Sequence, residues 1–232
     1  MKFNKVKNTH ASILVLSLAS MLCSNASFAV DYYLCAKQED NVMPDGVSVP
    51  MWGFALDDNA DLTDGCASSI QVPGPALTVP DNDTVLNIHL KNVGLPEPVS
   101  IVIPGQSAVM VPQMFPADAQ GRVRVRSFTH ETNSADVNST LYTWSNMRPG
   151  TFVYQSGTHP AVQIQMGLYG AVTKNSALNQ AYADIATVYD NEMQIFYSEV
   201  DPVLHNQVAS GIYGSTGMTS TIDYSPQYFL VN

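Results

Sequence analysis

Short runs in which apolar and polar residues alternate fill much of the chain after residue 70. In residues 84–90, Leu86, Ile88 and Leu90 alternate with more polar positions, among them His89. A period of two is typical of a half-buried strand. We therefore expect an all-β fold, a sandwich or barrel, with a short helix or a loop over 176–190 and a linker over 209–221. Further strands are expected over 99–103, 122–128, 141–144, 150–155, 161–166, 192–200 and, at the end of the chain, 228–232.

The first 29 residues have a different pattern. Three lysines precede an apolar run over 11–23, and Ser27 and Ala29 place small residues at the two positions that a signal peptidase reads. This layout is typical of a secretory signal peptide, and the run is shorter than the roughly 20 residues of a membrane span. An uncleaved anchor and a lipid-modified Cys23 are the alternatives. We expect a secreted or periplasmic chain with no membrane span after cleavage.

Charge narrows the choice of partners. Removing residues 1–29 leaves seven basic against twenty acidic residues, a net charge of about −13 with histidines neutral. Such a chain repels nucleic acid and anionic membrane surfaces, so neither is expected as a partner. Further β-domains or self-association remain as partner classes.

Two cysteines, Cys35 and Cys66, remain after the signal peptide. In an oxidising compartment an even pair most simply forms one disulfide. Two copper-binding thiolates are the alternative, but no histidine flanks either cysteine at ligand spacing. We predict a Cys35–Cys66 disulfide.

Several short phrases follow one another along the chain, at 72–80, 83–85, 90–92, 99–105, 144–154 and 165–171. Taken in order, they resemble the N-terminal cupredoxin domain of multicopper oxidases. That domain opens with a Pro-Gly-Pro segment followed by Asp-Thr-Val, and closes with Pro-Gly-Thr and Met-x-Gly-x-x-Gly phrases. The resemblance implies a cupredoxin-like Greek-key sandwich or barrel. It divides the chain into a signal peptide (1–29), a cupredoxin-like domain with an N-terminal extension (30–224), and a terminal strand or the start of a truncated second domain (225–232).

The same resemblance marks four positions at which the family carries copper-binding histidines. Two His-x-His pairs are expected there, because imidazole suits copper and a three-copper cluster needs several converging ligands. Here the matching residues are Val102, Pro104, Gln155 and Gly157. Copper is implied by resemblance alone, and the cofactor stays unassigned.

One histidine is a candidate metal ligand. His159 lies two residues beyond the second lost position, where a shifted loop would present it to a partner domain. The alternative is a polar loop residue bonded to backbone, which is the commoner fate of a lone histidine. His89, His130 and His205 receive no functional role, and His205 is expected near an exposed turn. No catalytic residue is assigned.

Two functions follow. The first is an exported cupredoxin-like module that is non-catalytic alone, because its His-x-His ligands are missing. The alternative is a contributing domain of a copper-dependent oxidoreductase, completed by further cupredoxin domains. Ancestry and activity are separate claims, so the resemblance does not by itself make the chain an enzyme.

Overall fold

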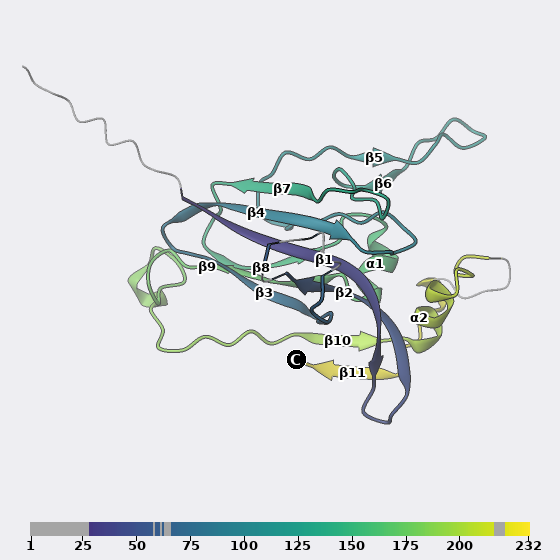
Figure 1. The fold of residues 1–232 in the computed structure, drawn as a ribbon. Coiled ribbons are helices and arrows are strands. Elements are labelled where there is room, and N and C mark those ends of the chain that lie inside the picture. Colours follow the sequence, from purple (N-terminus) through teal and green to yellow (C-terminus); the bar gives the residue numbers. More distant parts are fainter. Residues whose placement is uncertain (1–27, 58, 61, 63–65, 216–220) are drawn as a thin grey trace, which may run out of the picture.

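The computed structural model describes residues 28–57, 59–60, 62, 66–215 and 221–232. Strands are the main elements, as expected (Figure 1). They are β1 (Phe28–Val42), β2 (Ser48–Leu56), β3 (Gly74–Val79), β4 (Asp83–Asn92), β5 (Gln113–Met114), β6 (Val125–Ser127), β7 (Thr140–Ser145), β8 (Gly150–Gln155), β9 (Tyr169–Lys174), β10 (Tyr197–Val200) and β11 (Tyr228–Val231). The helices are α1 (Pro160–Met166) and α2 (Pro202–Ala209), and η1 (Ile185–Thr187) and η2 (Thr221–Asp223) are single 3₁₀ turns.

Two sheets enclose the core. One has the order β2-β1-β4-β7 and the other β3-β9-β8. Parallel pairing of β1 with β4 and of β3 with β9 shows that the chain crosses between sheets rather than running up and down. The two long strands β1 and β2 were not among the expected elements.

The alternation of β4 is realised in full. Leu86, Ile88 and Leu90 are completely buried, and the intervening residues are partly exposed. They pack in one core cluster with Trp52 from the first sheet and Tyr154 from the second. A side-chain period of two therefore orients β4 correctly.

The expected strand over 161–166 is wrong, because these residues form helix α1. Pro160 occupies the first turn, where its missing N–H costs nothing, and Gly167 with φ +120° ends the helix. The buried residues Val162, Gln163 and Met166 follow helical spacing rather than alternation. The segment 176–190 contains only the turn η1, and the 192–200 run is a strand only from Tyr197.

A disulfide joins Cys35 and Cys66, as predicted, with their Cα atoms 6.2 Å apart. Cys35 lies in β1 and both cysteines are buried. The signal peptide falls almost wholly outside the described residues. Cleavage after Ala29 would remove only the first two residues of β1. Among the described residues, none of the helices has the length and apolar character to cross a membrane.

Candidate functional site

Three of the four family ligand positions lie together. The backbone of Val102 pairs with that of Gln155, at 2.9 and 3.0 Å between nitrogen and oxygen in the two directions. Gly157 follows two residues beyond the end of β8 and lies against the Val102 side chain. We call Val102, Gln155 and Gly157 the ligand corner. Pro104 continues from it as an exposed residue.

The ligand corner does not fit a copper ion. Of its side chains only the Gln155 amide carries a polar atom. A Cβ placed on Gly157 would lie 2.7 Å from Val102 Cγ1 and 3.0 Å from Ser100 Oγ. The space in which a side chain at position 157 would begin is therefore filled by Val102. Within the described part of the chain, no three His, Cys, Asp or Glu side chains gather where they could hold one metal ion.

Hydroxyl groups hold the loop that follows the corner. Thr158 Oγ1 lies 2.9 Å from both Ser100 Oγ and Ser127 Oγ, and these two serine oxygens are 3.2 Å apart. Ser156 donates to the side-chain oxygen of Gln163 at 2.7 Å. All five side chains are buried, and satisfied buried polar groups of this kind make a structure specific. This network fixes the loop in place without supplying a nucleophile and base.

His159 is bound to a carboxylate. Its Nδ1 lies 3.1 Å from Glu97 Oε2, and the ring meets Tyr213 edge-on. The hydrogen bond to Glu97 raises the pKa of His159 against the opposing effect of burial. Burial raises the pKa of Glu97, but hydrogen bonds from His159 and Gln163 outweigh it and leave that pKa below its ordinary value. The partner is a side chain rather than backbone, and the role of His159 as a metal ligand stays a prediction.

Comparison with solved structures identifies the architecture. No family model matches the sequence, and no curated protein does. The blue copper oxidase from Nitrosomonas europaea matches with a TM-score of 0.55 and 15% identity, over 88% of this chain and 54% of that one. A laccase from Botrytis aclada matches with a TM-score of 0.53 and 18% identity, over 88% of this chain and 30% of that one. The fold is a cupredoxin-like fold.

The likeness concerns the fold alone. The copper nitrite reductase from Nitrosomonas europaea is similar at the same level, with a TM-score of 0.51 and 17% identity over 79% of this chain and 54% of that one. This cupredoxin domain spans about half the length, or less, of these relatives. Sequence identities this low carry no residue roles across.

The remaining histidines of the cupredoxin domain each have a partner. His89 Nε2 lies 2.9 Å from Asp31 Oδ1, and the His130 ring stacks on Tyr142 at 4.4 Å between centroids. The expectation that His205 lies near an exposed turn is wrong, because this residue is buried in α2. Its Nδ1 is 2.8 Å from the Pro50 carbonyl oxygen, and burial lowers its pKa. Because His205 and Pro50 are 155 residues apart, the sequence around His205 gives no indication of this contact.

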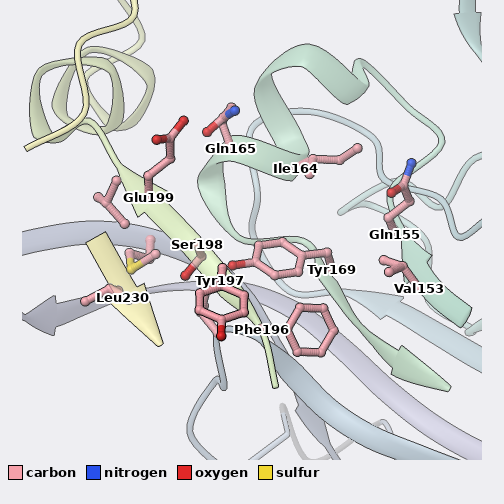
Figure 2. A pocket seen from close by; sticks show the side chains of 13 residues that line it. Val153, Gln155, Ile164, Gln165, Tyr169, Phe196, Tyr197, Ser198, Glu199 and Leu230 are labelled. Atoms are coloured by element: carbon pink, nitrogen blue, oxygen red, sulfur yellow. The ribbon is translucent and has the colours of Figure 1, made fainter. Parts of the chain in front are cut away.

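A cavity of about 280 Å³ opens beside Gln155 and was not foreseen from the sequence (Figure 2). Tyr169 and Phe196 form an aromatic wall, with ring centroids 5.8 Å apart, and Glu199 and Gln165 provide polar groups. Burial raises the pKa of Tyr169, so its phenol stays protonated at neutral pH. Such a site can enclose a small, mainly apolar group, and it contains no Ser, Cys or Lys paired with a base. The segments that line it are β2, β8, α1, β9, β10 and β11 with their flanking residues, which only the fold brings together.

Proposed function

We propose that this chain is an exported, non-catalytic cupredoxin module that acts by packing against another protein domain. The observation that carries the proposal is the ligand corner. The backbones of Val102 and Gln155 are hydrogen-bonded to each other in both directions, while the Val102 side chain fills the space that a ligand side chain at position 157 would need. If the ligand side chains were merely absent, an empty space would remain beside position 157, whereas Val102 fills that space.

Copper retention tests the proposal directly. The exported chain is purified anaerobically, loaded with copper, desalted and assayed for metal. We expect no stoichiometric copper, because no described cluster offers three ligands. One tightly held copper ion per chain would sink the proposal and favour a contributing domain of a copper oxidoreductase.

A matched variant locates any weakly held metal. His159→Asn removes the candidate ligand, and Asn tolerates the left-handed backbone at this position, where φ is +41°. If trace copper on the parent chain disappears in this variant, the metal is bound by His159. The His89→Asn variant is the control for a histidine outside the corner.

Export is tested by the fate of residues 1–29. A chain expressed with its own N-terminus is expected to be recovered outside the cytoplasm with Val30 as its first residue. Replacing Ala29 with a bulky residue should block cleavage at this site. Recovery of the intact N-terminus in the cytoplasm would contradict export.

A further inference from the structure

An apolar ribbon projects from the sandwich. Residues 107–128, which contain β5 and β6, run along the outside of β7 and extend to a tip beyond it (Figure 1). We call this segment the ribbon. Monomeric proteins seldom expose apolar side chains in such a group without an interaction to cover them. Those exposed here are Val109, Met110, Val111, Met114, Phe115, Val123, Val125 and Phe128.

The ribbon also gathers the positive charge of an acidic chain. Arg122, Arg124 and Arg126 are three of the seven basic residues that follow residue 29. Arg122 and Arg126 pair with Asp118 and Glu131. Arg124 lies over the Phe115 ring, 5.7 Å from its centroid, and forms no carboxylate ion pair among the described residues.

The other cations are less accessible, apart from Arg148, which is exposed. Lys91 and Lys174 donate to backbone carbonyls, two and three of them respectively. Lys37 pairs with Glu39, and Arg148 donates to the Gly105 carbonyl. Exposed positive charge is therefore concentrated on the ribbon.

A second segment has the opposite charge. Residues 176–199, which we call the strap, contain Asp184, Asp190, Glu192 and Glu199 and no lysine or arginine. The strap is also rich in exposed apolar side chains, and Leu178, Ile185, Met193 and Tyr197 are each about four-fifths exposed. The ribbon and the strap thus both expose apolar side chains, and they carry opposite net charges.

The ribbon and the strap of one molecule cannot contact each other. In Figure 1 the ribbon lies at the top right and the strap at the lower left, with the sandwich between them. We propose that the ribbon of one copy of this chain docks on the strap of a second copy. The complementary surfaces are different patches, so the contact is head-to-tail and repeats from copy to copy, in a ring or an open chain.

Local complementarity favours a second copy as the occupant. The net charge of about −13 opposes association with a second copy as it does with an acidic membrane or nucleic acid, so the surface that meets the ribbon decides. The strap, in contrast, supplies the acidic apolar surface that the ribbon needs. The inference rests on the proposed role as a packing module, and it is independent of whether copper binds.

The test uses two variants that each remove one surface. The ribbon variant is Val109→Ser with Arg124→Ser, and the strap variant is Ile185→Ser with Met193→Ser. All four side chains are exposed, so we expect both variants to keep the parent's thermal unfolding midpoint. A control with Val42→Ser and Val47→Ser removes two exposed valines from the turn between β1 and β2.

Sedimentation velocity over a range of concentrations gives the readout. The parent chain and the control are expected to form species larger than a monomer, and each variant alone is expected to lose them. An equimolar mixture of the two variants should form a heterodimer and nothing larger, because one ribbon and one strap remain intact between them.

Three outcomes would overturn the inference. They are a parent chain that stays monomeric, a variant that assembles as the parent does, and a mixture of the two variants that stays monomeric. Copper analysis of the same samples separates this inference from the proposed function. A copper-free monomer would overturn the head-to-tail contact alone, and a copper-loaded assembly would overturn the non-catalytic role alone.

Discussion

The ligand corner and the ribbon, which begins five residues after Val102, are opposite in construction. The corner is buried, pairs its backbone across Val102 and Gln155, and fills its own space. The ribbon has only two paired positions between its strands and exposes most of its apolar side chains. The framework of the fold is thus complete at the corner, and the exposed apolar surface lies at the periphery. We expect changes in the framework to alter stability and changes at the periphery to alter association.

The disulfide gives the largest expected effect on the framework. Replacing Cys35 and Cys66 together with alanine removes a cross-link between residues 31 positions apart. Loss of a loop constraint of this length should lower the free energy of unfolding by about 3 to 4 kcal/mol, as measured by urea denaturation.

Association provides the control for this change. The variant should assemble like the parent under native conditions, because neither cysteine belongs to the ribbon or the strap. If the variant without the disulfide folds but no longer associates, association depends on the framework. That result would contradict the proposed separation between framework and periphery.

The packing of the corner gives the next largest effect. Gly157→Ala should lower the free energy of unfolding by about 1 to 3 kcal/mol, because its Cβ would meet Val102 Cγ1. Val102→Ala alone should cost about 2 kcal/mol by leaving a cavity. Together the two changes should cost less than the sum, since the smaller residue makes room for the new methyl group.

A double-mutant cycle measures this coupling by chemical denaturation. Strictly additive costs would show that Val102 does not occupy the space next to Gly157. The account of the corner as filled rather than empty would then fail, although the missing ligands would remain.

The sequence predicts the strands of the framework better than it predicts helix α1 or the cavity. The alternation in β4 is predicted correctly, because a period of two is visible in the local sequence. Helix α1 was misread, since apolar residues at 162, 164 and 166 imitate a strand. Pro160 before the run and Gly167 after it were the available helix signals.

Other features depend on contacts between distant segments. The cavity beside Gln155 needs β2, β8, α1, β9, β10 and β11 in place before it exists. Likewise, Glu97 meets His159 across 62 residues, and no local spacing indicates that pair. Such sites become visible only once the fold is known.

The smallest expected effect concerns the pair of His159 and Glu97, which borders the corner. The pKa of His159 is raised above its ordinary value of 6.5, so its contribution to stability is complete below pH 6.5 and is lost as pH rises through the raised pKa. The pKa of Glu97 is lowered from 4.5, so its contribution is present above that value and is lost as pH falls through the lowered pKa. The pair therefore stabilises the fold most between about pH 4.5 and 6.5.

In that range His159→Asn should lower the free energy of unfolding by about 0.5 kcal/mol, since both side chains are more than a third exposed and water screens the pair. The cost should shrink above neutral pH, and Glu97→Gln should show the same dependence when unfolding midpoints are measured from pH 4 to 9. A cost that stays constant over this range would assign His159 a packing role against Tyr213 instead of an electrostatic one, and would leave its imidazole free for the metal that the sequence suggests.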